Sequence, residues 1–304
     1  MSKLVSVIIP TYGGGQFLHR TVDSVLAQTY KNIEIIVVDD NGIGTEKQLM
    51  TAETMQKYNN CDNVKYVCHD INKNGSAARN TGVKNSKGVY IALLDDDDEF
   101  VENNIEVLVN ELESLPGEYA LTYCSGTIFL GEEKNRDSLA TESGSLLYEV
   151  LMHKVTIGSS TLLIKKSVWD SLGGFDESFR RHQDWEFTAR VAAKYKVKAV
   201  DNIGCITHLE FRNSPKSAEK AYEYREHYLE KMRPLIEMLT PKQQKNVYVT
   251  NRMDIGVEFL KEKNIKRFND IWKKTKPGFK GFAIVFKRGI RFLMGKAIKR
   301  SKSD

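Results

Sequence analysis

The sequence predicts an α/β fold, in which a Rossmann-like, mostly parallel sheet has helices on both faces, followed by a helical C-terminal extension. Short β-branched runs alternate with single helical patterns over the first hundred residues. One such run ends in four consecutive carboxylates at residues 95–98. After about Pro215 the composition changes to Lys, Glu, Tyr and Gln at helix-like spacing.

The expected elements follow one another in a regular order. A strand at residues 5–9 is stopped by Pro10, and a helical pattern with Phe17, Val22 and Leu26 comes next. The chain then alternates between strands at 33–38, 64–68 and 89–94 and helices at about 46–58 and 76–85. In a parallel sheet of this kind the ligand crevice lies at the carboxyl ends of the strands.

Three of those strand ends carry polar or acidic residues, at positions 10–12, 39–40 and 95–98. Four adjacent Asp side chains repel one another, and a hard divalent cation or a proton usually neutralises them. The alternative is a solvated acidic loop without a ligand. Because the neighbouring strand ends also carry polar or acidic residues, we favour the interpretation in which a divalent cation binds here.

The segment at residues 74–82 combines a turn with the start of a helix. Asn74 and Gly75 form the turn, Ser76 is the expected N-cap, and Arg79 lies one turn into the helix. A helix N-terminus with a guanidinium suits a diphosphate, although an ordinary cap with a solvated Arg is the alternative. Residues 13–15 are all Gly and lack the Lys and Ser or Thr of a nucleoside-triphosphatase loop, which argues against ATP hydrolysis.

Composition predicts a globular protein with 41% hydrophobic residues and a net charge of +5 that hides a basic C-terminal end. Four cysteines without metal-ligand spacing are expected to be free thiols in a reducing cytoplasm. Met1, Ser2 and Lys3 lead directly into a strand, so no signal peptide is expected, and no apolar run reaches the ~18 residues of a spanning helix. The expected location is the cytoplasm, either in solution or bound peripherally to the inner face of the cell membrane.

Four motifs together resemble the inverting family 2 glycosyltransferases of GT-A fold. They are VSVIIPTY at 5–12, VVDD at 37–40, NKNGSAARN at 72–80 and YIALLDDDD at 90–98. The resemblance covers roughly the first two hundred residues. It implies a GT-A domain at 1–214, with a donor half at about 1–100 and an acceptor half at about 101–214. Residues 215–304 then form the helical region with a basic amphipathic end.

The resemblance also implies roles for individual residues around a nucleotide-sugar donor. Asp40 is similar to the carboxylate that accepts from the uracil imide, and Asp97 ends an Asp-x-Asp motif that binds Mn²⁺ or Mg²⁺. His208 is a secondary metal candidate. The residues expected at the nucleotide are Pro10, Thr11, Tyr12, Asp40, Asn74, Gly75, Arg79, Asp95, Asp96 and Arg212. Departures from the family pattern are Gly13, where Asn is common, and Asn41-Gly42, which follows the acidic pair in place of Gly-Ser.

The second half is expected to supply the acceptor side. A mixed strand at 158–164 and a Gly-Gly-Phe-Asp turn at 173–176 precede the Gln-Asp-Trp-Glu segment at 183–186. The resemblance makes Asp184 the general base that deprotonates an acceptor hydroxyl, in a single displacement that turns an α-linked donor into a β-glycoside. The alternative is that Asp184 is a helix N-terminal charge favoured by the helix dipole.

The C-terminal end predicts a basic amphipathic helix over residues 282–297. Phe282, Phe286, Ile290, Leu293 and Ala297 share one face, and Lys and Arg residues gather largely on the other. Such a helix suits an anionic membrane surface, and a lipid-linked saccharide in bacterial cell-surface polysaccharide synthesis would then be the natural acceptor. The alternative is a helix packed on its own domain or on a second subunit of a homo-oligomer.

Two other functions remain open from the sequence. A sugar-nucleotide nucleotidyltransferase would need a Gly-rich loop with cations after the first strand, and residues 13–16 hold none. A catalytically inactive, membrane-associated adaptor would not need Asp95, Asp97 and Asp184. Nucleic-acid binding is not expected, since basic residues concentrate only in the tail. A UDP-sugar with a hexosyl or N-acetylhexosaminyl group is favoured over GDP- or dTDP-sugars.

Overall fold

The computed structural model describes residues 2–209 and 215–288 of the chain. These residues form two compact units. Among the described residues, the first unit comprises 2–150 and 155–209, and the second comprises 151–154 and 215–288.

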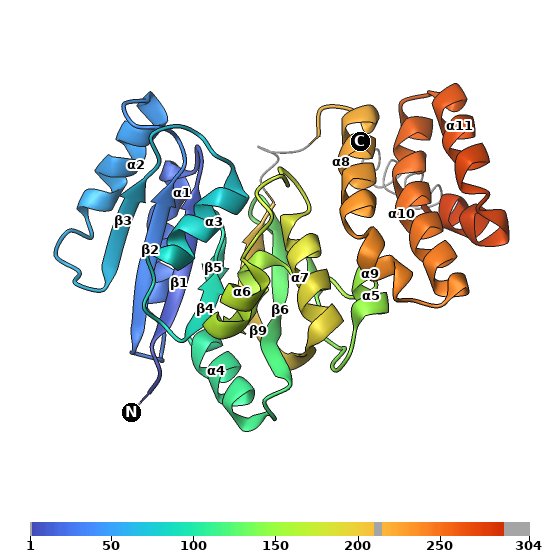
Figure 1. Cartoon of the computed structure of the whole chain (residues 1–304). Coiled ribbons are helices and arrows are strands. Elements are labelled where there is room, and N and C mark those ends of the chain that lie inside the picture. Colours follow the sequence, from blue (N-terminus) through green and yellow to red (C-terminus); the bar gives the residue numbers. More distant parts are fainter. Residues whose placement is uncertain (1, 210–214, 289–304) are drawn as a thin grey trace. The chain divides into compact units, whose positions relative to one another are not determined.

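The first unit begins with alternating strands and helices (Figure 1). Strands β1, β2, β3 and β4 lie in the order β3-β2-β1-β4, and all three pairings between them are parallel. This part confirms the predicted parallel sheet. The elements are β1 (Val5–Thr11), α1 (Gly15–Leu26), β2 (Ile33–Asp39), α2 (Glu46–Gln56), β3 (Val64–Cys68), α3 (Gly75–Lys84) and β4 (Tyr90–Leu93).

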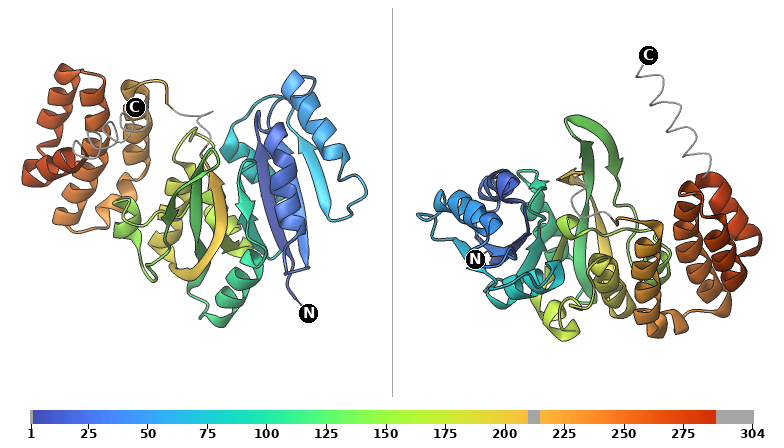
Figure 2. Two further views of the ribbon diagram at one scale, coloured as in Figure 1. Left: turned by 180° about the vertical axis from the view of Figure 1, so that it is seen from behind. Right: turned by 90° about the horizontal axis from the view of Figure 1, so that it is seen from above.

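The sheet continues beyond β4 with mixed pairing. Strand β8 runs antiparallel to β4 and β6, β6 runs parallel to β9, and β5 pairs antiparallel with β9. The hairpin of β6 and β7 extends beyond the neighbouring strands (Figure 2, right). The elements are β5 (Glu99–Phe100), α4 (Asn104–Ser114), β6 (Tyr119–Leu130), β7 (Glu133–Ser138), α5 (Leu147–Leu151), a 3₁₀ turn (Ser159–Thr161), β8 (Leu162–Lys165), α6 (Lys166–Leu172), α7 (Gln183–Lys194) and β9 (Lys196–His208).

Helices cover both faces of the sheet, as the sequence predicts. Every residue of β1 is buried, which explains why its sequence is a continuous apolar run rather than an alternating one. Val7 on one face joins a core cluster with Val22 of α1 and Leu108 of α4. Ile8 on the other face meets α3, where a Cβ on Gly82 would lie 2.2 Å from its Cγ2. The helix therefore needs Gly82 to approach β1 this closely.

The expected strand at 158–164 is wrong in its first half. Residues Ser159–Thr161 form a 3₁₀ turn, and β8 begins only at Leu162. The Thr161 hydroxyl donates to the Gly158 carbonyl at 2.9 Å, and this local bond competes with strand pairing.

The second unit is helical, as predicted for the C-terminal region. Its core contains Tyr222, Val249, Met253, Phe259 and Ile271 from three helices. None of the helices within the described residues has the length and apolar content needed to cross a bilayer. The helices are α8 (Ala218–Lys231), α9 (Arg233–Glu237), α10 (Pro241–Lys261), α11 (Ile265–Thr275) and a further helix that includes residues 278–288.

Candidate active site

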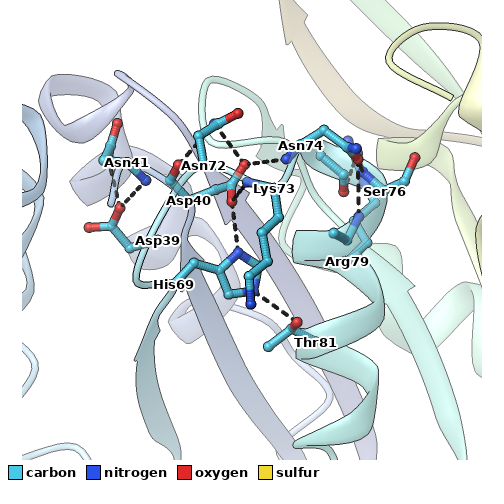
Figure 3. A network of polar contacts seen from close by, with 12 residues as sticks. Asp39, Asp40, Asn41, His69, Asn72, Lys73, Asn74, Ser76, Arg79 and Thr81 are labelled. Atoms are coloured by element: carbon cyan, nitrogen blue, oxygen red, sulfur yellow. Dashed lines mark hydrogen bonds and ion pairs between the residues drawn. The ribbon is translucent and has the colours of Figure 1, made fainter. Parts of the chain in front are cut away.

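The carboxyl ends of β1, β2, β3 and β4 meet at one edge of the sheet because the four strands are parallel. These ends bring together Thr11, Asp40, His69 and Asp95. Figure 3 shows the polar network around the ends of β2 and β3 and the loop before α3. The sequence located this edge correctly but did not single out His69.

Asp40 organises the loop at residues 72–74. Its carboxylate accepts hydrogen bonds from the backbone N–H groups of Lys73 at 2.7 Å and Asn74 at 2.8 Å, and from the Asn72 side chain at 2.9 Å. His69 Nδ1 lies 2.7 Å from Asp40 Oδ1 (Figure 3). Asp40 is only 2% exposed, so in this structure its oxygens shape the loop; its role at a nucleotide base stays a prediction.

Helix α3 is capped by Asn74, which corrects the expectation that Ser76 is the N-cap. The Asn74 side chain accepts from the N–H groups of Ser76 at 2.9 Å and Ala77 at 3.2 Å, with Asn74 at φ 90°. The Ser76 hydroxyl instead donates to the Phe179 carbonyl at 3.0 Å. Asn tolerates positive φ better than most residues, which explains why Asn occupies this capping position.

Arg79 lies one turn into α3 and points to the end of β4. Its guanidinium donates to the Gly75 carbonyl at 3.2 Å and forms an ion pair with Asp95. A Cβ on Gly75 would lie 2.9 Å from Arg79 Nη1 and 3.7 Å from Gln183 Nε2, so the start of α3, Arg79 and the start of α7 are close neighbours. The Arg79 side chain is 6% exposed and the Asp95 side chain 40%.

The ends of β1 and β2 are joined by Asn41, a residue that departs from the family pattern and was not expected to have this role. Its side-chain oxygen accepts from Gly13 N at 2.8 Å, and its side-chain NH₂ donates to Asp39 at 2.8 Å. Pro10 and Thr11 are buried in β1, whereas Tyr12 is 45% exposed beneath Lys47 Nζ at 4.5 Å from its ring centroid. Tyr12 therefore has a partly exposed ring at the strand end, with Lys47 over one of its faces.

The four acids after β4 alternate in exposure. Asp95 and Asp97 are half-exposed, while Asp96 and Asp98 are 7% and 5% exposed. Asp96 accepts from the Thr11 hydroxyl at 2.6 Å. Burial raises the pKa of Asp98 well above its usual range, and the charges of Asp95 and Asp97 raise it further. The pattern separates two structural acids from two that are accessible to a ligand.

His208 faces Glu99 in this structure. Its Nε2 lies 2.8 Å from Glu99 Oε1, and Arg20 Nε lies 3.3 Å from the same oxygen. Arg20 also donates to the Asp97 carbonyl at 2.6 Å and thus ties the acidic turn to α1, a contact that no sequence signal indicated. Within residues 2–209 and 215–288, no three His, Cys, Asp or Glu side chains are arranged to hold a metal ion by themselves. Arg212 lies outside the described residues.

Asp184 lies in the first turn of α7, and the charges of Arg79 and Asp95 affect its pKa. Burial raises its pKa to about 6, the positive charge of Arg79 lowers it and the negative charge of Asp95 raises it. The helix begins after His182, which has φ 65° and stacks on Trp185 with ring centroids 4.0 Å apart. The start of α7 lies beside the start of α3, because a Cβ on Gly75 would meet both Arg79 and Gln183, and Arg79 in turn pairs with Asp95.

Asn80 of α3 fixes the turn that precedes α7. Its side chain donates to the Phe175 carbonyl at 2.9 Å and to Glu177 at 3.0 Å, and it accepts from Phe175 N at 2.9 Å. Gly174 has φ 70°, and a Cβ there would lie 2.5 Å from Asn80 Oδ1. This close approach explains why the turn has Gly at position 174. The hydrogen bonds of Asn80 connect α3 to the turn that precedes α7.

We expect Asn80→Ala to lower the free energy of unfolding by about 1–3 kcal/mol, because the turn loses three hydrogen bonds. Thermal unfolding followed by circular dichroism measures the change. Asn59→Ala, at an exposed position, is the matched control and should unfold like the wild type. Equal unfolding temperatures for Asn80→Ala and Asn59→Ala would contradict this role of the turn.

Comparisons with known proteins identify the family. The model of glycosyl transferase family 2 matches residues 6–160. An uncharacterized glycosyltransferase of Rickettsia prowazekii (strain Madrid E) is 35% identical over 195 residues, which cover 61% of this chain and 57% of that protein, so the match spans little more than half of the relative. The putative colanic acid biosynthesis glycosyl transferase WcaA of Escherichia coli (strain K12) is 29% identical over 237 residues, covering 74% of this chain and 82% of WcaA.

Solved structures confirm the predicted fold class. The crystal structure of S. aureus TarS in complex with UDP-GlcNAc has a TM-score of 0.62 at 14% identity, covering 90% of this chain and 92% of that one. The TarS complex with UDP has a TM-score of 0.58 over the same shares. The likeness shows the GT-A fold with additional C-terminal helices. Together with the motifs at the strand ends, the family match shows that this chain belongs to glycosyl transferase family 2.

Proposed function

We propose that the protein transfers a sugar from a UDP-sugar to a hydroxyl of a saccharide acceptor in bacterial cell-surface polysaccharide synthesis, with inversion at the anomeric carbon. The observation that carries the proposal is that the start of α7, which holds Asp184, lies next to the start of α3 and Arg79, whose guanidinium pairs with Asp95. Two similar proteins support the substrate classes, because WcaA is a putative colanic acid biosynthesis glycosyl transferase and TarS was solved in complex with UDP-GlcNAc.

Asp184 is the proposed general base. A carboxyl group with a pKa of about 6 is largely ionised at neutral pH and holds a proton more strongly than an ordinary Asp. It can therefore take the proton of an acceptor hydroxyl as that oxygen attacks the sugar. One displacement of this kind inverts the anomeric configuration and needs no second nucleophile.

Arg79 and the exposed face of Tyr12 are proposed to bind the donor. The guanidinium of Arg79 suits the oxygens of a diphosphate, and the N-terminal turn of α3 adds backbone N–H groups nearby. The exposed ring of Tyr12 offers a flat surface to a base or ribose. The Asp40 carboxylate supports the position of Arg79, because it holds the loop from which α3 starts.

Asp97, with Asp95, is proposed to hold Mn²⁺ or Mg²⁺. Divalent cations of this type often take one or two protein carboxylates and complete their shell with water and substrate phosphate oxygens, and the two accessible acids fit that donor set. When bound, the cation would neutralise charge on the departing nucleoside diphosphate. His208 remains a secondary candidate ligand, although its Nε2 contacts Glu99 here.

The test of the proposal is a screen followed by product analysis. UDP-, GDP- and dTDP-sugars are added with and without Mn²⁺, and thermal stabilisation identifies the donor. Transfer to a saccharide acceptor is then followed by NMR of the anomeric proton. We expect stabilisation by a UDP-sugar and a β-linked product from an α-linked donor. An α-linked product would overturn the inverting mechanism, and stabilisation by none of the UDP-sugars would overturn the donor class.

A further inference from the structure

The helix over residues 278–288 is held against α10 by one face. A Cβ on Gly281 would lie 2.2 Å from Pro277 Cβ and 3.3 Å from Met253 Cγ, so the helix approaches α10 closely at this position. Ile284 packs against the core of the second unit. Arg288 forms an ion pair with Asp254 at 2.9 Å. These contacts fix which face of the helix points outward.

The outward face is aromatic. Phe279, Phe282 and Phe286 are 86%, 59% and 60% exposed, and the rings of Phe282 and Phe286 stack with centroids 6.2 Å apart. Their spacing of three and four residues places them in one row on the helix. We call these three residues the Phe stripe. A single exposed apolar residue is ordinary, but a continuous row of large ones marks a surface that binds something apolar.

The charge around the Phe stripe selects the partner. Lys276 and Lys287 are exposed beside it. Residues 273–288 contain six Lys and Arg residues and no acidic residue. Two copies meeting through this surface would bring two strongly positive segments together, which is unfavourable. An anionic lipid surface offers both an apolar interior and compensating charge.

We propose that the Phe stripe inserts into the interface of a membrane that contains anionic lipids, while the flanking lysines contact the headgroups. The sequence predicted an apolar face that includes Phe282 and Phe286, and the structure adds Phe279 and shows which helix face packs on α10. Ile290, Leu293 and Ala297 of that predicted face lie outside the described residues. Membrane binding through the Phe stripe does not depend on the identity of the donor or on the mechanism of transfer.

The test is sedimentation of the full chain with lipid vesicles. Vesicles of phosphatidylcholine alone are compared with vesicles that also contain phosphatidylglycerol. We expect binding to the anionic vesicles to be stronger by about tenfold or more. The double variant Phe282→Ser/Phe286→Ser should lose about tenfold or more of that binding. The matched control is Met238→Ser/Ile265→Ser, which removes two apolar residues that are 63% and 62% exposed elsewhere in the same unit.

Circular dichroism and sedimentation velocity complete the experiment. The Phe→Ser variant should keep the wild-type helix content, because it leaves Gly281, Ile284 and Arg288 in place. Equal vesicle binding by this variant and the wild type would overturn the proposal. So would equal binding to neutral and anionic vesicles. A wild-type dimer that the Phe→Ser variant dissociates, without vesicle binding by either, would assign the Phe stripe to a second copy of the chain instead.

Discussion

Asp184→Asn is expected to lower the rate of sugar transfer by about 10²–10⁴-fold, the range that a positioned general base contributes. Asn has nearly the shape of Asp but cannot accept the proton of the acceptor hydroxyl. Donor affinity should stay close to that of the wild type, since Arg79 and the strand-end acids are retained. Steady-state kinetics measures the transfer rate, and calorimetry measures donor binding.

The pH dependence of the wild type follows from the same group. Because burial raises the pKa of Asp184 to about 6, kcat/KM should fall about tenfold per pH unit below pH 6 and level off above it. The residual activity of Asp184→Asn should not show this step. A wild-type profile without a transition between pH 5 and 7 (about one unit either side of that pKa) would contradict the assignment.

The free energy of unfolding of Asp184→Asn shows whether lost activity comes from removal of the base or from loss of the fold. A raised pKa means that the folded state binds the proton more tightly than the unfolded chain, so this group adds stability at acidic pH and the contribution is lost as the pH rises through about 6. Asn carries no such charge. Above pH 7 the variant should therefore be as stable as the wild type or more stable, by up to about 3 kcal/mol. Asp170→Asn, an exposed position on α6, is the control for charge removal and should keep full transfer.

Asp97→Asn is the second change with a large expected effect. Removing a proposed metal-ligating carboxylate should weaken the response of transfer to Mn²⁺ by about a hundredfold or more. Titration of Mn²⁺ at a fixed donor concentration measures the concentration that gives half-maximal transfer. We expect that concentration to rise steeply, while the fold and thermal stability in the absence of metal are kept.

Asp98→Asn is the matched control, because it removes a carboxylate from the next position along the chain. Asp98 is 5% exposed and accepts from the backbone N–H of His208 at 3.2 Å, so its contacts point into the protein. The carbonyl oxygen of Asn can accept the same bond. The response to Mn²⁺ should therefore persist in Asp98→Asn. If both variants lost it equally, Asp97 would not have a distinct role.

The sequence predicted the parallel strands and the polar residues that meet at their ends, because both depend on local patterns, whereas the roles of the site residues stay predictions. Buried parallel strands appear as continuous apolar runs, and polar residues at their ends show where the crevice lies. The glycine-containing motif at 72–80 and the Asp residues at 95–98 could be recognised for the same reason. In the second half of the first unit, the prediction for Asp184 came from the family resemblance. Without it, Asp184 would look like an ordinary acid at a helix N-terminus.

The details that the sequence did not predict depend on contacts between distant residues. His69 meets Asp40 across 29 residues, and Asn80 meets Phe175 across 95. Neither pairing leaves a periodic signal. Ser76 and Asn74 are both good N-cap residues, and only the backbone conformation imposed by the Asp40 contacts decides between them.

The most direct test of the account is calorimetric titration of the wild type with UDP-GlcNAc, in the presence of Mn²⁺ and again with the metal removed by a chelator. The central claim is that the acids after β4 bind a sugar nucleotide through a divalent cation. We expect binding with Mn²⁺ that weakens by about tenfold or more without it. Measurable binding with the same affinity in both conditions would contradict the claim.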